Sequence, residues 1–334
     1  MSQKSHTFED ALDLELGGSL STPHVNYTTY GELNASRDNV IWACHALTAN
    51  SEVGDWWNAL FGEGELFDPT KYFIICANNL GSPYGTSSPK TINPTTGEGY
   101  RHEFPAYTIR DTAALHLRLL DHLNIASIHC LIGGSCGGNI AQEMAISLGD
   151  RVKSMRIMCC SAQESPWVIS IHESQRIAMH ADLTFKGNEP TAGQEGLRGA
   201  RAFALPFYRS HASFAIRQSE DDLEKVSDFK AASYVRYQGQ KFVDRYDPFC
   251  YYHQLNALDT HNVGRGRGSI EQALYMIKAD TQVIGFSSDL LIPTSEQHRL
   301  ASLIPGASYV EIETQFGHDA FLIETDALRE VLVM

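Results

Sequence analysis

The chain has 334 residues, enough to bury a full core in one large domain or in two smaller ones. Its net charge of −14 argues against a nucleic-acid or anionic-membrane surface, and 43% apolar with 20% charged residues is typical of a soluble globular protein. No apolar run is long enough to span a bilayer, and the N-terminus lacks the apolar core of a signal peptide, so we expect neither membrane insertion nor secretion.

Seven cysteines are present, an odd number without any C-x-x-C pair. Several lie in apolar runs, where a thiol packs as a small apolar side chain. We therefore expect reduced thiols and a cytoplasmic protein. We also expect no metal site, because no cluster of ligands with zinc spacing occurs.

The first third of the chain alternates apolar runs with turn-rich segments. After a strand-rich lead-in, the sequence predicts strands at 27–30, 40–44 and 72–76. A loop over about residues 82–108 is rich in Pro, Gly, Ser and Thr, and loops of that length are usually functional. A helix with apolar residues at helical spacing is expected from Thr108 to Leu123.

A strand, a glycine-dense turn and a helix follow, and the rest of the chain is organised around them. The apolar run 128–132 predicts the strand and 140–146 the helix, with Ser135 between them in a G-x-S-x-G pattern. This is the pattern of a nucleophile elbow, where small neighbours allow a strained serine to project its hydroxyl. A glycine-rich turn that merely packs is the weaker alternative, because the strand and the helix stand where the elbow requires them.

A strand at 155–160 continues the alternation, which predicts a mainly parallel sheet covered by helices on both faces. Strand-like runs then vanish until about residue 280, and we interpret 161–280 as an inserted helical lid between two parts of an α/β core, 1–160 and 281–334. Ordinary crossover helices are the alternative. The helices expected in this insertion span 169–179, 196–208, 229–237 and 248–258.

Two polar residues after late strands complete a catalytic triad with Ser135. A serine hydroxyl needs a base and an orienting acid, which follow the elbow in the order acid, then histidine. Asp289 follows a strand at 281–286, and His318 follows the next strand, at 308–312. All three therefore lie at the carboxyl edge of the sheet, where open sheets bind ligands.

The alternatives without a catalytic role are an Asx turn for Asp289 and a surface-loop position for His318. Cys136 as the nucleophile is disfavoured, because it stands one residue past the turn. The oxyanion donors should be the backbone N–H groups of Cys136 and of Leu47, which follows an early strand. A helix is expected from Thr294, with Thr294 and Gln297 forming a capping box.

From about residue 20 to 325 the chain resembles the homoserine O-acyltransferases of the α/β-hydrolase fold, and the homoserine O-acetyltransferases most of all. The matching stretches are TYGELNASRDN, CHALT, INPTTGEGY, FPAYTIRD, GGSCGG, SYVRYQGQKFVDRYD, GFSSD and GHDAFLIE. Several lie outside the catalytic pattern, so a generic elbow would not produce them.

The resemblance implies a two-step reaction of methionine biosynthesis, in which serine takes an acetyl group from acetyl-CoA and passes it to the hydroxyl of homoserine. It implies Ser135, Asp289 and His318 as the triad, and Leu47 and Cys136 as the oxyanion-hole positions. It implies substrate-binding roles for Asp319, toward the ammonium group, and for Arg201, toward the carboxylate, with Tyr208 in the pocket. An amino acid needs one anion and one cation to fix its two ends.

The resemblance also implies no bound cofactor and a homodimer formed through the lid. Blander roles are a helix cap for Asp319 and a solvated helix face for Arg201. The chain departs from the family at Cys136, usually Met, and at Ala49-Asn50, usually Gly-Asp. Leu291 replaces the arginine of relatives that use succinyl-CoA, which favours acetyl.

Three other activities stay open. They are transfer to L-serine, transfer of a succinyl group, and hydrolysis by a plain esterase with water as the acceptor. Homoserine and serine differ by one methylene, worth only about 1–3 kcal/mol in a pocket. A binding protein without catalysis is the least favoured, because every part of the triad is present.

Overall fold

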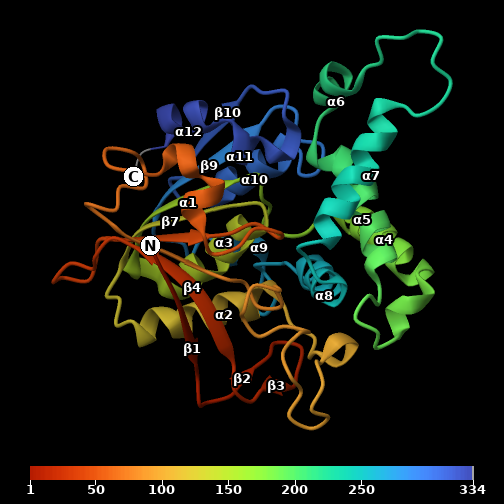
Figure 1. Cartoon of the computed structure of the whole chain (residues 1–334). Coiled ribbons are helices and arrows are strands. Elements are labelled where there is room, and N and C mark those ends of the chain that lie inside the picture. The colour runs from red at the N-terminus through yellow and green to blue at the C-terminus, as the bar shows by residue number, and fades with distance from the viewer. Residues whose placement is uncertain (333–334) are drawn as a thin grey trace.

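An eight-stranded sheet crosses the middle of the molecule in the computed structural model, which describes residues 1–332 (Figure 1). In spatial order its strands are β1 (Ser2–Thr7), β4 (His24–Tyr30), β6 (Phe73–Ala77), β5 (Val40–Cys44), β7 (Ile128–Gly134), β8 (Val152–Met158), β9 (Asp280–Phe286) and β10 (Ser308–Ile312). β1 pairs antiparallel with β4, and β4 with β6; the other pairings are parallel. The expected mainly parallel sheet is confirmed. A separate two-stranded sheet joins β2 (Leu12–Asp13) to β3 (Ser19–Leu20).

Helices cover both faces of the sheet, because its central strands are apolar on both sides. Neighbouring residues of β5 join opposite cores: Trp42 packs in the cluster beneath α2 and α3, and Ile41 in the cluster beneath α1, α11 and α12. The flanking helices are α1 (Val53–Trp56), α2 (Ile109–His122), α3 (Cys136–Leu148), α9 (Ile270–Leu274), α10 (Thr294–Leu303), α11 (Ala320–Ile323) and α12 (Thr325–Val331).

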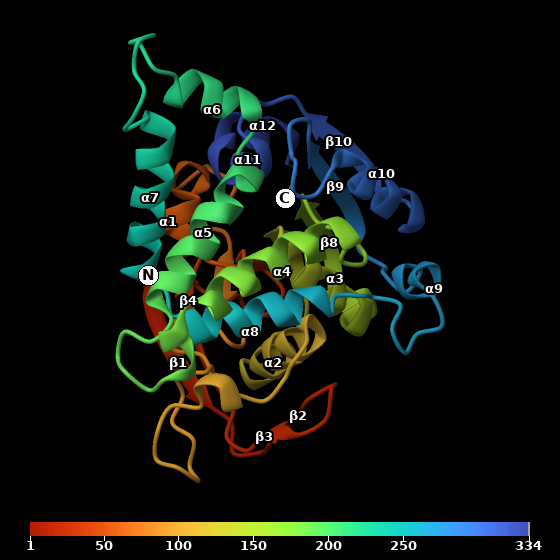
Figure 2. The same cartoon turned by 90° about the vertical axis from the view of Figure 1, so that its right-hand side faces the viewer.

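Between β8 and β9 the chain forms a group of helices that stands to one side of the sheet (Figures 1 and 2). They are α4 (Pro166–Ala181), α5 (Gln194–Tyr208), α6 (His211–Gln218), α7 (Lys230–Val243) and α8 (Pro248–Asp259). The four helices expected in this region are present, and α6 and α9 are additional. The boundaries of the lid at 160/161 and 280/281 remain a prediction.

The capping box expected at Thr294 is wrong. Pro293 occupies the N-cap position, without any side-chain cap, and Thr294 is already the first helical residue. Gln297 is fully buried instead, and its amide donates to the carbonyl oxygens of Cys160 (3.4 Å) and Ile292 (3.3 Å). Tertiary packing therefore determines the position of this side chain. Among the helices of residues 1–332, none combines the length and the apolar character that crossing a membrane requires.

Candidate active site

Ser135 lies on the sharp turn between β7 and α3, in a backbone conformation that residues other than glycine rarely adopt. Its φ is 56° and its ψ is −129°, as expected of a strained elbow. The neighbouring glycines are sterically required. A Cβ on Gly137 would lie 2.0 Å from the carbonyl oxygen of Cys44, and one on Gly133 would lie 2.5 Å from the carbonyl oxygen of Gly137. The helix begins directly at Cys136, earlier than the sequence predicts.

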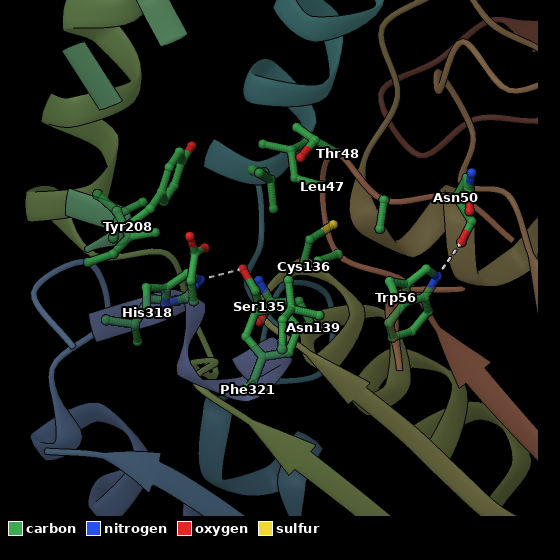
Figure 3. Close-up of a pocket in the computed structure, with 18 of the residues that line it drawn as sticks. Leu47, Thr48, Asn50, Trp56, Ser135, Cys136, Asn139, Tyr208, His318 and Phe321 are labelled. Atoms are coloured by element: carbon green, nitrogen blue, oxygen red, sulfur yellow. Dashed lines mark hydrogen bonds between the residues drawn. The ribbon is translucent and has the colours of Figure 1, made fainter. Parts of the chain in front are cut away.

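The structure brings Ser135, His318 and Asp289 together in one hydrogen-bonded line. His318 Nε2 lies 2.9 Å from Ser135 Oγ (Figure 3). On the other side of the ring, Nδ1 lies 2.7 Å from Asp289 Oδ2. The other oxygen of Asp289 accepts hydrogen bonds from the backbone N–H groups of Leu291 and Ile292, each at 2.9 Å. These bonds fix the carboxylate, which in turn orients the imidazole with Nε2 toward the serine.

The neighbourhood of His318 favours its protonated form. Burial of the ring lowers the pKa, but the negative charge of Asp289 and their hydrogen bond raise it, and Asp319 and Glu164 add to the rise. The net pKa of His318 lies above its ordinary value. An imidazole in this environment is a competent base that is also stabilised after it takes a proton.

Cys159, Asp289 and His318 place three potential metal-ligand atoms within 4.8 Å of one another. The donors do not fit a metal. Burial raises the pKa of the Cys159 thiol well above its ordinary value, so no thiolate is offered, and the Asp289 carboxylate already holds His318 Nδ1.

Leu47 and Cys136 both line the cavity beside Ser135 (Figure 3). Cys136 begins α3, so its backbone N–H belongs to the unsatisfied first turn of the helix. The loop of Leu47 is held by two residues that follow α7: Tyr246 Oη donates to the Leu47 carbonyl (2.9 Å), and Arg245 donates to the Thr48 carbonyl (2.8 Å). The backbone on both sides of the serine is therefore fixed before any substrate binds.

His45, which precedes this loop, packs in the core as a neutral ring. Burial lowers its pKa to about 4. Nδ1 donates to the Ala46 carbonyl (2.8 Å), and Nε2 accepts from the backbone N–H of Asn79 (3.0 Å). His45 thus supports the loop and has no free nitrogen to serve as a catalytic base.

A cavity of about 570 Å³ opens onto Ser135 between the sheet edge and the lid. Tyr208 lies on one side of the serine, and Asn50 and Trp56 lie on the other (Figure 3). The cavity therefore extends to both sides of Ser135.

Arg201, Tyr208 and Asp319 all line this cavity. The guanidinium of Arg201 stacks between the rings of Tyr208 and Phe242, 5.0 Å from each centroid. Asp319 Oδ2 lies 3.3 Å from Nε of Arg209. Burial raises the pKa of Asp319, and the charges of Arg209, Arg201 and His318 oppose that rise.

Sequence reasoning missed Glu164, which lies in the same cavity and is 5% exposed. Burial raises its pKa to about 8, so the carboxyl is largely uncharged at neutral pH. It also missed the pair formed by His172 Nδ1 and Asp259 Oδ1, 2.6 Å apart, in which His172 lines the cavity. The available signal for Glu164 was its place between a parallel strand and the first lid helix, at the sheet edge that carries the triad.

A family model described as the alpha/beta hydrolase fold matches residues 39–325. The homoserine O-acetyltransferase of Cyclobacterium marinum is 42% identical over 332 residues, covering 99% of this chain and 94% of the relative. The crystal structure of homoserine O-acetyltransferase from Bacillus anthracis superposes with a TM-score of 0.90 at 25% identity, over 98% of this chain and 95% of that one. Esterase E22 superposes with a TM-score of 0.89 at 20% identity, over 98% of each chain, and at that identity the likeness shows the fold alone.

Proposed function

The chain belongs to the homoserine O-acetyltransferases of the α/β-hydrolase fold, and we propose that it catalyses the reaction of that family. It transfers an acetyl group from acetyl-CoA to the hydroxyl of L-homoserine, which is a step of methionine biosynthesis. The observation that carries the proposal is the hydrogen-bonded line from Ser135 through His318 to Asp289. No bound cofactor is needed, because the thioester is the activated group and the serine is the carrier.

In the first half-reaction, His318 Nε2 takes the proton of Ser135 Oγ as the oxygen attacks the thioester carbonyl. The backbone N–H groups of Leu47 and Cys136 stabilise the resulting oxyanion. When the C–S bond breaks, CoA leaves with the proton from His318, and Ser135 carries the acetyl group.

In the second half-reaction, the hydroxyl of the acceptor gives its proton to His318 and attacks the acetyl-serine. Ser135 recovers the proton, and the O-acetyl amino acid leaves. In this proposal Asp319 binds the acceptor's ammonium group, Arg201 binds its carboxylate, and Tyr208 packs against the substrate. Leu291 offers no cation to a succinyl carboxylate, which supports acetyl as the acyl group.

Mass spectrometry of the enzyme mixed with acetyl-CoA alone tests the first half-reaction. We expect one acetyl group on Ser135 and none in the Ser135→Ala variant. Adding L-homoserine should then discharge the adduct as O-acetylhomoserine. Absence of an adduct on Ser135 would contradict the proposal.

The product distinguishes the alternatives in the same experiment. Free acetate as the main product would indicate an esterase, and a higher kcat/KM for L-serine than for L-homoserine would change the acceptor. A higher kcat/KM for succinyl-CoA than for acetyl-CoA would change the donor.

We propose further that the protein acts in the cytoplasm and forms a homodimer through the lid. In support of the dimer, several lid side chains are apolar and exposed, and they are Leu183, Phe203, Ile216, Leu223, Val226 and Tyr237. Light scattering coupled to size-exclusion chromatography tests this. A species of only 37.1 kDa at micromolar concentration would contradict the dimer.

A further inference from the structure

Arg209 contacts the proposed acceptor site without lining it. It follows the last residue of α5, and its Nε lies 3.3 Å from Oδ2 of Asp319. Asp319 lines the cavity in front of Ser135, whereas Arg209 lines a separate small cavity with residues of α6 and α7. Arg209 therefore contacts the carboxylate of Asp319 on the side away from the active-site cavity, and the acceptor contacts it on the cavity side.

The backbone around Arg209 is fixed against the loop that carries His318. Gly317 has a φ of +68°, and a Cβ there would lie 2.5 Å from the carbonyl carbon of Arg209. Ser210 Oγ donates to the carbonyl oxygen of Gln315, and it also accepts the N–H of Ser213 at 3.0 Å, which caps α6. The end of α5 and the histidine loop thus hold each other in one arrangement.

Burial and four charged groups act on the pKa of Asp319. Burial raises its pKa, and the charge of Arg209 opposes that rise more strongly than the charge of either Arg201 or His318 does. Asp289, across the triad, raises the pKa of Asp319. The nearby Cys159 thiol carries no charge, because its own pKa is raised well above the ordinary value.

The two arginines have different tasks once the acceptor binds. Arg201 lines the cavity, and the proposed function assigns its charge to the acceptor's carboxylate. Among residues 1–332, Asp319 is the carboxylate with which Arg209 forms an ion pair, so the charge of Arg209 stays with Asp319. A partly buried aspartate that loses such a partner binds a proton more readily, and the protonated form has lost its charge attraction for an ammonium group.

We propose that Arg209 is a positioning residue for the acceptor: its ion pair keeps Asp319 charged, so that the ammonium group of the amino acid meets a carboxylate. The inference rests on the proposed function, because it needs an acceptor that carries an ammonium group. It predicts that Arg209 acts mainly on the second half-reaction. Because the charge of Asp319 also raises the pKa of His318, loss of Arg209 shifts the acid limb of the first half-reaction to lower pH and leaves its rate above that limb unchanged.

The test compares Arg209→Gln with Arg209→Lys and with Arg217→Gln. Arg217 is a matched control, because it stacks over Phe316 of the same loop, 5.5 Å from the ring, and forms no ion pair with Asp319. In Arg209→Gln we expect the KM for L-homoserine to rise about tenfold or more near neutral pH. Arg209→Lys should restore most of the loss, and Arg217→Gln should behave as the native chain.

The pH dependence separates this role from simple loosening of the loop. Without Arg209 the pKa of Asp319 rises further, so the carboxylate is lost at a higher pH as the solution is acidified. The ratio of the KM of Arg209→Gln to the native KM at the same pH should therefore fall toward one as the pH rises. A KM raised equally at every pH, or not raised at all, would overturn the inference.

A second readout uses 4-hydroxybutanoate, which has the hydroxyl and the carboxylate of homoserine but no ammonium group. At a pH above the acid limb of the native profile, Arg209→Gln should lower kcat/KM for homoserine and leave kcat/KM for 4-hydroxybutanoate unchanged. Equal losses for both acceptors would overturn the inference. Failure of acetyl-CoA to acetylate Ser135 in the native chain would instead refute the proposed function, so the two failures are distinguishable.

Discussion

The imidazole of His318 is buried beside carboxylates, and these two conditions act on its pKa in opposite directions. Burial lowers the pKa, whereas Asp289 raises it through its charge and through a hydrogen bond of 2.7 Å. Asp289 together with Asp319 and Glu164 outweighs burial, so the pKa lies above the ordinary value of 6.5. A base must be neutral to accept the serine proton, and the position of this pKa therefore limits activity in acid.

The rate of Ser135 acetylation should fall as pH drops through the pKa of His318. We expect the midpoint of the acid limb above 6.5, measured as the release of CoA thiol in single-turnover experiments. In Asp289→Asn the midpoint should move to lower pH, and the rate should fall by about 10³–10⁴-fold. A native midpoint at or below 6.5 would contradict this account of the site.

Glu164 is a buried acid whose raised pKa is opposed by the charge of His318. Among the residues that the structure describes, no lysine or arginine forms an ion pair with it, and its carboxyl accepts only the N–H of Ser165, at 3.3 Å. Burial is the main cause that raises its pKa, to about 8, and Asp259 and Glu296 add to the rise. The sequence places Glu164 near the sheet edge but does not show that its carboxyl is buried, because the burial arises only when the lid packs over that edge.

Glu164→Gln should stabilise the protein increasingly as pH rises. The folded pKa lies above the unfolded value of 4.5, so the native glutamate loses stability between pH 4.5 and about 8 and little beyond. The gain from glutamine should reach about 3–5 kcal/mol in the free energy of unfolding at the alkaline end. Urea unfolding at several pH values measures it, with the exposed Glu98→Gln as a control. A gain that does not vary with pH would count against this assignment.

The turn between β7 and α3 brings the backbone of α3 into direct contact with the backbone of β5, at a place where side chains usually separate two elements. The first residues of α3 rest directly on the end of β5, so that a Cβ on Gly137 would lie 2.0 Å from the carbonyl oxygen of Cys44. The nucleophile and one oxyanion donor lie at this contact, so a side chain added there would displace both.

Gly137→Ala should destabilise the protein by about 1–3 kcal/mol and abolish most acetyl transfer, because α3 must shift and move Ser135 and the N–H of Cys136 with it. Gly199→Ala is the control. It lies on α5, where the nearest atom to a new Cβ is 3.8 Å away, and alanine in a helix should stabilise by about 0.5–1 kcal/mol. Full activity in Gly137→Ala would show that the elbow accepts a side chain.

The elements that sequence predicts well are those whose signal is local. The strands around the elbow and helix α2 follow from apolar periodicity, and the capping box of α2 is present, with Thr108 Oγ1 accepting the N–H of Asp111. The cap expected at Thr294 does not form, because the amide of Gln297 donates instead to the carbonyl oxygens of Cys160, after β8, and of Ile292, in the loop before α10. The local capping pattern is overridden there by contacts between segments far apart in the chain, and such contacts cannot be predicted from a short stretch of sequence.

At the scale of the whole molecule, parallel strands explain why the triad was predictable. Ser135, Asp289 and His318 each follow a strand of one parallel set, so topology alone brings them to one edge. The contacts between lid and core were not predictable in this way. The pairing of Arg209 with Asp319 depends on how α5 docks on the histidine loop.

Glu143 joins three segments that lie far apart in the sequence. It sits on α3 and is 2% exposed, 3.2 Å from Arg110 of α2 and 2.7 Å from Arg267, in the segment that returns from the lid to β9. Arg110 also pairs with Glu15 of the N-terminal lead-in. The network therefore fixes the end of the lid insertion to the helix that carries the nucleophile.

Glu143→Leu should destabilise the chain by about 3–5 kcal/mol, because it leaves two guanidinium groups without their buried partner. Glu173→Ala is the control. It removes a carboxylate 2.7 Å from Arg176, but that carboxylate is 58% exposed, so we expect a cost of about 0–1 kcal/mol. Urea unfolding measures both changes. Since Glu143 does not line the active-site cavity, Glu143→Leu should keep its acetylation rate per folded molecule below the unfolding transition. A loss of that rate at full folding would mean that the network also positions Ser135 through α3.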